Sequence, residues 1–478
     1  MKLRSLAALG LTVMGDADIT GVAADNRAVT PGDLFAGVPG DHVHGARFAS
    51  DAVGRGAAAV LTDDAGAEHV PAGTPFVIAP DVQGVLGRVA ALAYGEPAKR
   101  LRSFAVTGTN GKTTTAYMVE HILARLGSIT GLVGTVALQI AGEDVPARLT
   151  TPQPADLQRF LATLVEAGGT DLVMEVSSHA LAQRRTDPIR YTVAGFTNLT
   201  QDHLDYHGTL DEYFEAKALL FAEDKCERAV IWTDDEYGFR LWARLASKGR
   251  PVAWVGRTDR DGRGWLVQGS RNFTLTGDAK YSCHIGLPGE FNIANAALAA
   301  AMVLESGIPG AAEAIADITP MVPGRMEVLS EHPRVIVDFA HNADALEKVI
   351  SSLRNDTSGR LITLTGSAGD RDALKRPIMG RVVADGSDVF YLTDDDPHSE
   401  DPAKIRAEVR AGAEGRVEIR EIGDRAEAIR HAILTARHDD TVLLAGRGHE
   451  TIQEVGSDLI ELDDRVVARE ALARRDRA

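Results

Sequence analysis

Hydrophobic residues in this chain fall into two kinds of run. Short apolar runs of strand length end in glycine or polar residues at 103–108 (SFAVTG), 170–178 (TDLVMEVSS) and 191–199 (YTVAGFTNL). A longer apolar stretch at 292–306 (NIANAALAAAMVLES) has the length of a helix. Because strands and helices alternate, the pattern predicts an α/β fold whose mainly parallel sheet is covered by helices on both faces.

Proline and glycine divide the chain into three blocks. The first holds strand patterns at 30–41 (TPGDLFAGVPGD) and 56–64 (GAAAVLTDD), and it ends in a linker at 94–103 (YGEPAKRLRS). A second break follows the central block, where Pro320, Pro323 and Gly324 interrupt the helical pattern. We therefore predict three domains, at residues 1–98, 99–322 and 323–478.

The third block contains four apolar strand patterns. They lie at 334–341 (RVIVDFAH), 360–367 (RLITLTGS), 388–396 (DVFYLTDDD) and 440–448 (DTVLLAGRG). Each ends in polar or glycine residues, and in open α/β sheets ligands bind beyond the carboxyl ends of the strands. The pattern predicts a Rossmann-like sheet with a binding site at that edge.

Composition and charge narrow the class of protein. The 478 residues carry a formal net charge of −17, which argues against a nucleic-acid binder. Cys226 and Cys283 are far apart in sequence and lack metal-ligand spacing, as expected in a reducing cytoplasm. The N-terminal MKLRSLAALGLTVMG predicts a first helix and strand, since no convincing signal cleavage site follows it. No apolar run has the roughly 18 residues of a membrane span, so we expect a cytoplasmic protein.

The stretch 105–115 (AVTGTNGKTTT) resembles a phosphate-binding loop. It lacks the spacing of the usual Walker A motif, because Val106 stands where the first glycine is required. A strand nevertheless leads into the loop, and a helix is predicted to start near Lys112, so backbone N–H groups and the helix dipole favour phosphate there. Lys112 would meet the terminal phosphates and Thr113 would hold Mg²⁺. The predicted phosphate-binding residues are Gly108, Thr109, Asn110, Gly111, Lys112, Thr113 and Thr114.

Titratable residues follow the next two strand patterns. Glu175 ends one, where an acid would hold the metal, and the segment 197–221 gathers Asp202, His203, Asp205, His207 and Lys217. His203 is a candidate metal ligand. Lys217 lies on an aromatic and aliphatic helix face, and periodicity alone also permits a lysine that keeps its ammonium in water.

Seven motifs occur together in the order found in Mur ligases. They are GTNGKTT, EVSSHAL, TNLTQDHLDYHG, YFEAKALLF, PGEFNIANAALA, GRME and DFAHN. The resemblance spans essentially the whole chain, and it is strongest to the members that extend UDP-N-acetylmuramoyl-L-alanyl-D-glutamate (UDP-MurNAc-L-Ala-D-Glu). It implies three domains, for uridine, ATP and an amino acid, and the shortened loop is the usual form in this family.

The resemblance also implies an ATP- and Mg²⁺-dependent amide-forming ligase of cell-wall synthesis. In the family the lysine matching Lys217 is carbamylated (N6-carboxylysine), which turns a cation into an oxygen ligand. The implied catalytic residues are Lys112, Glu175, His203 and Lys217, and the implied metal ligands are Thr113, Glu175, His203 and Lys217. The implied ATP contacts beyond the loop are Asn292, Asn295, Arg325 and Asp338.

The resemblance also implies which residues of this chain contact the substrates. The muramoyl dipeptide would meet Thr150, Thr151, Ser177, Gln183 and Arg185. Uridine would lie against Asn26, Asp41, His42 and Val43. Two positions depart from the family pattern, because Asn26 replaces a usual serine and Leu149 an often polar residue.

The predicted amino-acid pocket departs further. Its residues are Arg371, Asp395, Asp396, Pro397, His398, Gly446 and Glu450. Enzymes that add meso-diaminopimelate typically show D-N-P-R, whereas this chain has DDPH at 395–398. An arginine binds the distal carboxylate of diaminopimelate in a bidentate way, which histidine does poorly. The substitution favours L-lysine, and L-ornithine and meso-diaminopimelate remain open alternatives.

Two other classes compete with this interpretation. A folylpolyglutamate synthase shares the central fold, but the uridine-site pattern at 25–45 argues against it. A non-catalytic P-loop switch such as a GTPase is disfavoured because no convincing N-K-x-D motif is present. We expect a monomer whose partners are small-molecule substrates, with no nucleic acid and no membrane span.

Overall fold

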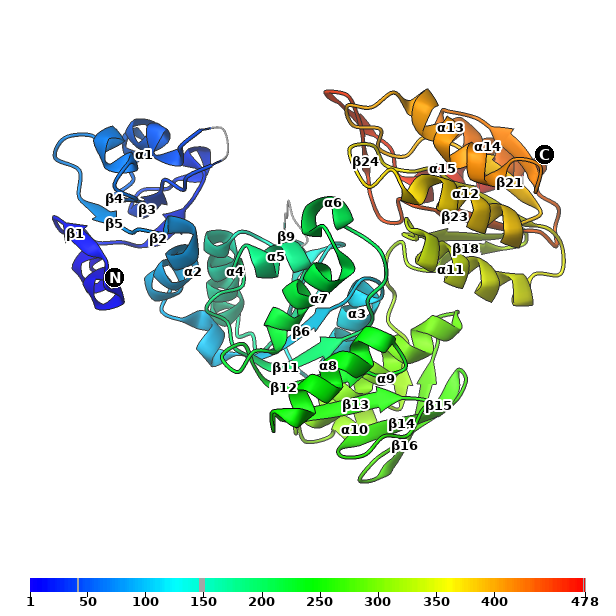
Figure 1. The fold of residues 1–478 in the computed structure, drawn as a ribbon, viewed down its shortest axis with the longest axis horizontal. Coiled ribbons are helices and arrows are strands. Elements are labelled where there is room, and N and C mark those ends of the chain that lie inside the picture. Colours follow the sequence, from blue (N-terminus) through cyan, green and yellow to red (C-terminus); the bar gives the residue numbers. More distant parts are fainter. Residues whose placement is uncertain (41–42, 146–150, 476, 478) are drawn as a thin grey trace.

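The computed structural model describes residues 1–40, 43–145, 151–475 and 477. Within these ranges the strands form sheets of five, twelve and six strands and one two-stranded hairpin. Figure 1 shows the three large sheets in three separate bodies that follow one another along the chain. The predicted α/β class and its three-part organisation are confirmed.

The first sheet is parallel except at one edge. In spatial order it contains β1 (Thr12–Met14), β5 (Phe76–Ile78), β4 (Ala59–Thr62), β3 (Asp33–Ala36) and β2 (Gly21–Ala23), with only β1 antiparallel. Its α-helices are α1 (Ala49–Gly54) and α2 (Val82–Ala93). The expected first helix is a 3-10 helix, Leu3–Leu9, which Gly10 ends in a left-handed conformation at φ 77°. The strands predicted within 30–41 and 56–64 are β3 and β4.

The central sheet has a parallel middle flanked by antiparallel pairs, and its edge strand β17 pairs parallel with β16. Its order is β17 (Asp317–Ile318), β16 (Lys280–Ile285), β15 (Asn272–Thr276), β14 (Gly264–Gly269), β13 (Val252–Gly256), β12 (Cys226–Trp232), β11 (Tyr191–Phe196), β6 (Arg102–Thr107), β10 (Asp171–Glu175), β7 (Thr130–Val133), β8 (Leu138–Ile140) and β9 (Glu143–Val145). The run from β14 to β7 is parallel.

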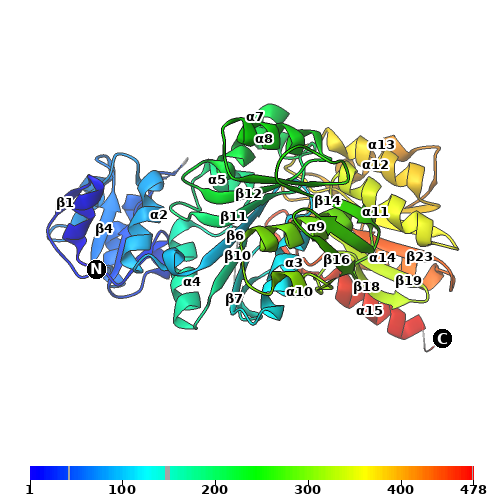
Figure 2. The ribbon, with the colours of Figure 1, turned by 90° about the horizontal axis from the view of Figure 1, so that it is seen from below.

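Helices cover both faces of the central sheet. They are α3 (Lys112–Arg125), α4 (Pro154–Glu166), α5 (Ser178–Ala182), α6 (Leu204–His207), α7 (Leu210–Ala218), α8 (Glu236–Ser247), α9 (Glu290–Glu305) and α10 (Ala311–Ala314). Alternate residues of β6 point to opposite faces, so Phe104 and Val106 pack with α3 and α9, whereas Ala105 packs with α4, α7 and α8. Figure 2 shows α7 and α8 on one side of β11 and β12, and α3 and α10 on the other.

The C-terminal sheet is parallel apart from its first strand. Its order is β18 (Glu327–Glu331), β19 (Arg334–Asp338), β23 (Thr441–Ala445), β20 (Leu361–Thr365), β21 (Val389–Leu392) and β22 (Glu418–Glu421). Helices α11 (Ala343–Asp356), α12 (Lys375–Gly386) and α13 (Pro402–Ala413) pack on one face, and α14 (Arg425–Thr435) and α15 (Asp464–Arg475) on the other. The hairpin of β24 (Ile452–Val455) and β25 (Asp458–Glu461) follows β23. All four predicted strands of this block are present.

Hydrogen bonds join the central body to both neighbours. Arg159 on α4 donates to the Tyr94 hydroxyl at 3.0 Å and to the Val22 carbonyl at 3.1 Å, which fixes the first sheet. On the other side, the Asn110 amide donates to Asp344 at 2.8 Å. Among the described helices, none is long and apolar enough to cross a bilayer.

Candidate active site

The predicted phosphate loop joins the end of β6 to the start of α3. Glu175 at the end of β10 pairs with Val106, and Phe196 at the end of β11 pairs with Thr107, so both neighbouring strands end beside the loop. Gly108 has φ 150°, and a Cβ there would lie 1.9 Å from the Thr197 hydroxyl. A glycine is therefore required at this point, and α3 begins at Lys112 as predicted.

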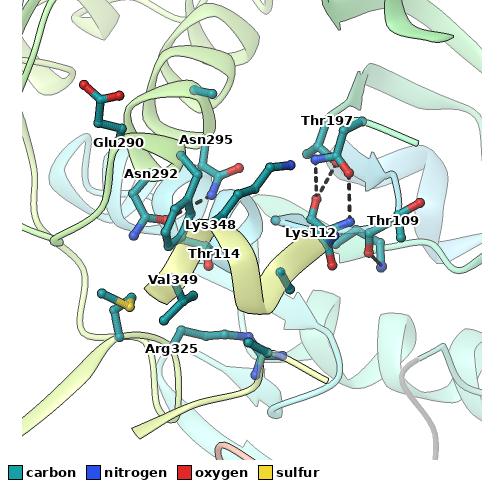
Figure 3. A pocket seen from close by; sticks show the side chains of 18 of the residues that line it. Thr109, Lys112, Thr114, Thr197, Glu290, Asn292, Asn295, Arg325, Lys348 and Val349 are labelled. Carbon is teal, nitrogen blue, oxygen red and sulfur yellow. Dashed lines mark hydrogen bonds between the residues drawn. The ribbon is translucent and has the colours of Figure 1, made fainter. Parts of the chain in front are cut away.

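The loop opens into a cavity of about 690 Å³ between the central and C-terminal bodies. Figure 3 shows Asn292 and Asn295 of α9 on one wall, Lys348 and Val349 of α11 on a second, and Arg325 below. The two asparagine amides are hydrogen-bonded to each other at 3.0 Å. Such a volume, with the phosphate loop and the start of α3 at one end and amides at the other, suits a nucleotide.

Two lysine side chains converge on the phosphate loop. Lys112 donates to the Gly108 carbonyl at 3.0 Å and to the Thr109 carbonyl at 2.8 Å, and Lys217 donates to the Gly108 carbonyl at 2.8 Å. Lys217 is only 1% exposed, so the alternative in which its ammonium stays in water is wrong. Burial lowers the pKa of Lys112, and burial together with the charge of Lys112 lowers the pKa of Lys217 well below its usual value.

Glu175 is fully buried beside the loop. Its carboxylate accepts from the Thr113 hydroxyl at 2.9 Å, from the Thr135 N–H at 2.9 Å and from the Thr135 hydroxyl at 3.3 Å. The Arg325 guanidinium donates to the same Thr113 hydroxyl at 3.3 Å. Two of the predicted metal ligands, Thr113 and Glu175, are therefore in direct contact, and Arg325 reaches them from the C-terminal body.

His203 lies in a group of rings next to Lys217. Its ring centroid is 5.0 Å from that of His179 and 6.2 Å from that of Tyr213, and the Lys217 ammonium lies 4.2 Å from the centre of the Tyr213 ring. Burial lowers the pKa of His203 to about 4, so its imidazole is neutral and able to bind a metal. His203 and Lys217 thus border the same aromatic ring. Among the described residues, neither side chain forms a hydrogen bond with Glu175.

Asp338, predicted to contact ATP, anchors the segment that joins the central and C-terminal bodies and carries Arg325, which we call the hinge segment. Its carboxylate accepts from the backbone N–H groups of Met326 and Ala340, at 2.8 and 2.9 Å. Burial raises the pKa of Asp338, and the charge of Arg325 opposes that shift. Arg325 itself stacks on Phe339 with 4.1 Å between the guanidinium carbon and the ring centre. Asp338 therefore positions the segment that carries Arg325.

The residues predicted to meet the muramoyl dipeptide form a cluster next to Glu175. Arg185 donates twice to the Gln183 side-chain oxygen, at 2.9 and 2.6 Å, and to the Thr151 carbonyl at 3.2 Å. The Thr151 hydroxyl donates to the Glu175 carbonyl at 3.1 Å, and Ser177 caps α5. Thr150 lies outside the described residues.

The predicted uridine residues are only partly described. Asn26 donates to Asp51 at 2.7 Å in the first body, and Val43 is exposed there. Asp41 and His42 lie outside the described residues.

Three acidic side chains meet in the predicted amino-acid pocket. Oxygen atoms of Asp395, Asp396 and Glu450 lie within 4.8 Å of one another. Burial raises the pKa of Glu450 to about 8, and the charge of Asp395 adds to the shift. A Cβ on Gly446 would lie 2.7 Å from an Asp395 oxygen, so the glycine at φ 114° lets the two loops approach. The cluster can hold a cation, either a metal ion or an ammonium group.

A fully buried arginine sits among these acids. Arg447 contacts Asp396 in an ion pair, and the same nitrogen lies 3.8 Å from Asp395 and 3.9 Å from Glu450. It also hydrogen-bonds the Ile452 carbonyl, which ties the acids to β24. Among the described residues, Arg447 offsets the charge of Asp396 and leaves Asp395 and Glu450 without a cation of their own.

The other predicted members of the pocket lie on the loops 370–372 and 395–398. His398 has φ 49°, and its ring contacts the Glu454 carboxylate at 3.0 Å. Arg371 is exposed, and its guanidinium donates a hydrogen bond to the Asp370 carbonyl at 3.1 Å. Pro397 precedes His398 in the same loop, and its carbonyl accepts from Glu400 at 3.0 Å. Arg371 is thus free to turn toward a ligand, whereas His398 is held by the hairpin.

Comparison with known proteins assigns all three bodies to one family. Residues 18–94 match "Mur ligase family, catalytic domain", residues 106–303 "Mur ligase middle domain", and residues 324–448 "Mur ligase, glutamate ligase domain". The chain belongs to the Mur ligase family. Both predicted breaks, near residues 98 and 322, fall between these matched ranges.

The Mur ligase has relatives along its whole length. Two proteins named UDP-N-acetylmuramoyl-L-alanyl-D-glutamate--2,6-diaminopimelate ligase are each 42% identical to it. The protein from Streptomyces coelicolor aligns over 96% of this chain and 93% of its own, and that from Gloeobacter violaceus over 99% of both. A solved structure with the same name has 30% identity and a TM-score of 0.66, and the match covers 96% of this chain and 95% of that one.

A folylpolyglutamate synthase from Mycobacterium tuberculosis shares the fold only, at 21% identity, a TM-score of 0.62 and 76% of this chain. The Mur ligase is an amide-forming enzyme, and these relatives are named as ligases. The expected preference for L-lysine finds no support among these relatives, whose names specify 2,6-diaminopimelate.

Several residues of this Mur ligase site were not predicted from the sequence. Thr135 binds Glu175, Asn198 holds the backbone of Asn110, and Arg447 balances the acids. Arg447 lies at the polar end of the strand pattern 440–448, so its charge was a visible signal. Thr135 and Asn198 follow the ends of β7 and β11, and their importance depends on strand order.

Proposed function

We propose that the chain joins a diamino acid to the D-Glu γ-carboxylate of UDP-MurNAc-L-Ala-D-Glu at the expense of ATP, with domains at 1–98, 99–322 and 323–478. The hydrogen bond from Thr151 to the Glu175 carbonyl carries the proposal. It puts the anion-binding group of Arg185 next to the phosphate end of the nucleotide cavity. A substrate carboxylate and a γ-phosphate would meet there.

The donor set near Glu175 suits Mg²⁺, which prefers oxygen ligands. Thr113 and Glu175 supply two oxygen donors, and His203 supplies a neutral imidazole. Lys217 as an ammonium does not fit, but burial lowers the pKa of this lysine and so favours the free amine that reacts with CO₂, with loss of a proton; the resulting carbamate would add an oxygen ligand. Bound Mg²⁺ would neutralise polyphosphate charge during transfer.

The protein's own cations would act on the phosphates. Lys112 leaves the Gly108 and Thr109 carbonyls and turns to the γ-phosphate, while Arg325 approaches from the hinge. The D-Glu carboxylate attacks that phosphate and gives an acyl phosphate and ADP. The amine of the diamino acid then attacks the acyl carbon, and inorganic phosphate leaves. Contact between the two bodies keeps water from the acyl phosphate.

The first candidate for the amino acid is 2,6-diaminopimelate, because the relatives carry that name. The acids Asp395 and Glu450 would hold its distal ammonium, and the exposed Arg371 would bind a carboxylate. The second candidate is L-lysine or L-ornithine. It is favoured by one observation: His398 is bound to Glu454, so no arginine clamp for a distal carboxylate stands at this position.

Phosphate release separates the candidates. The enzyme is supplied with ATP, Mg²⁺ and UDP-MurNAc-L-Ala-D-Glu, and kcat/KM is compared for meso-diaminopimelate, L-lysine and L-ornithine. The proposal expects release with at least one amino acid and the highest value with diaminopimelate. A clear preference for L-lysine or L-ornithine establishes the second candidate. No release with any of the three contradicts the proposal.

A single variant sharpens the amino-acid assignment. His398→Arg restores the family's usual residue, and one bidentate carboxylate contact is worth about tenfold in affinity. If the clamp is missing, this variant raises kcat/KM for diaminopimelate about tenfold and leaves L-lysine unchanged. If another residue already supplies the clamp, the variant leaves diaminopimelate unchanged as well.

A further inference from the structure

The loop 446–450 touches both candidate substrate pockets. On one side, Arg447 and Glu450 belong to the acidic pocket. On the other, His449 crosses to the central body, where its Nε2 lies 3.1 Å from the Thr135 carbonyl oxygen. Adjacent side chains of this loop therefore reach both sites.

The hydrogen bond from His449 leads directly to Glu175. Because a carbonyl only accepts, His449 donates from Nε2, and burial lowers its pKa to about 3, which keeps the ring neutral. Thr135, whose carbonyl is held, donates from both its N–H and its hydroxyl to the Glu175 carboxylate. The orientation of Thr135 therefore sets two of the hydrogen bonds of the carboxylate.

Close backbone packing holds the loop in position. A Cβ on Gly324 would lie 2.2 Å from the His449 nitrogen, and a Cβ on Gly448 would lie 2.8 Å from the Gly324 carbonyl oxygen. Both glycines have positive φ, at 63° and 56°. The loop thus packs without a gap against the hinge segment that carries Arg325, so His449 cannot shift alone.

We propose that His449 is a positioning residue: through the Thr135 carbonyl it orients the Glu175 carboxylate, and it thereby links the amino-acid pocket to the nucleotide pocket. The inference rests on the proposed function, in which Glu175 serves the nucleotide. His449 touches neither substrate in this role. Its Nδ1 is buried and has no hydrogen-bond partner among the described residues, so the contact with Thr135 is the one hydrogen bond that the ring makes to them.

Binding of a non-hydrolysable nucleotide tests the link without any ligase reaction. The dissociation constant of Mg·AMPPCP is measured by calorimetry for the wild type, His449→Ala, His449→Gln, Glu175→Gln and the double variant His449→Ala/Glu175→Gln. We expect His449→Ala to weaken binding five- to tenfold. His449→Gln, whose amide N–H reaches a similar point, should stay within twofold of the wild type. Thermal unfolding of each variant establishes that it is folded.

The double variant decides whether His449 acts through Glu175. We expect His449→Ala to have no further effect once Glu175 is replaced. His438→Ala, an exposed histidine of the same body, is the matched control and should bind as the wild type does. Wild-type binding by His449→Ala, or full additivity in the double variant, overturns the inference.

A second measurement tests the connection between the pockets. Saturating diamino acid should strengthen Mg·AMPPCP binding in the wild type by at least fivefold, and this effect should disappear in His449→Ala and return in His449→Gln. Equal strengthening in His449→Ala overturns the link. If the nucleotide-binding results are as expected but the ligase assay yields no product, the proposed function alone is rejected. If ligation is normal but the effects of His449→Ala and Glu175→Gln on nucleotide binding are additive, the inference alone is rejected.

Discussion

The nucleotide loop and the amino-acid pocket lie at the carboxyl ends of parallel strands, but they are built differently. The nucleotide loop is one continuous segment whose shape depends on backbone conformation at Gly108 and Gly111. The amino-acid pocket is assembled from side chains on separate loops, with Asp395, Asp396 and Glu450 around Arg447. A backbone site keeps its ligand through many substitutions, whereas a pocket of charged side chains can change its ligand through one or two.

The largest expected effect concerns the charge balance of the amino-acid pocket. Arg447→Met removes a fully buried guanidinium and leaves Asp396 without its partner. Breaking a buried ion pair by removing one partner costs about 3–5 kcal/mol of unfolding free energy. Urea denaturation at pH 7.5 measures the loss.

Two further variants test this assignment. Arg447→Met/Asp396→Asn removes both charges and should recover much of the stability. Arg416→Met breaks an exposed pair with Asp385 and should cost at most about 1 kcal/mol. If Arg447→Met and Arg416→Met are equally stable, the pocket does not depend on its central charge.

The next effect is on the nucleotide loop. Lys112→Ala removes the cation expected at the γ-phosphate, and loss of one such preorganised group lowers kcat about 10²- to 10³-fold. The unfolding free energy should change little, because the Lys112 pKa is lowered by burial and the amine is costly to keep charged there. Phosphate release measures the activity, with Lys248→Ala on the surface as the control. A stable variant with more than a tenth of wild-type activity would contradict the role of Lys112.

The same difference between the two sites explains which features were predictable from the sequence alone. Elements and loop were predictable because each depends on local pattern: apolar runs gave β6, β10 and β19, and Lys112 begins α3 as expected. The burial of the Lys217 side chain was not predictable, because its helix face is also compatible with an ammonium group in water.

Contacts between distant segments were also beyond reach. Asn198 follows β11 and binds the loop after β6 only because these strands are neighbours in the sheet. The substitution DDPH was visible, but its consequence depends on where His398 points. The ring lies against Glu454 on a hairpin more than fifty residues later in the chain, and no spacing in the sequence indicates that contact.

A smaller effect should appear in the pH dependence of the amino-acid pocket. The pKa of Glu450 is raised to about 8 by burial and then by Asp395, so at pH 7 its carboxyl is mostly protonated. An ammonium group binds the ionised form better. KM for the diamino acid should therefore fall about eightfold from pH 7 to 8.5, because the ionised fraction rises from about a tenth to about three quarters.

Glu450→Gln removes this titration. Its KM should be higher and nearly flat over the same range, and initial rates at several amino-acid concentrations measure both curves. An unchanged pH dependence of this KM in Glu450→Gln would assign the titration to another group.

The smallest effect lies where the two regions meet. Asn110 belongs to the nucleotide loop, but its side chain donates to Asp344 at 2.8 Å and accepts from Asn342 at 3.2 Å, at the start of α11. Because α11 forms one wall of the nucleotide cavity, Asn110→Ala should raise KM for ATP about fivefold, the value of one net hydrogen bond. Thr200→Ala removes only the 3.4 Å contact with Asn110 inside the central body and should stay within twofold. If the two variants behave alike, the backbone of the loop alone determines nucleotide affinity; if Asn110→Ala is clearly weaker, the affinity of the backbone site also depends on side chains from the C-terminal body.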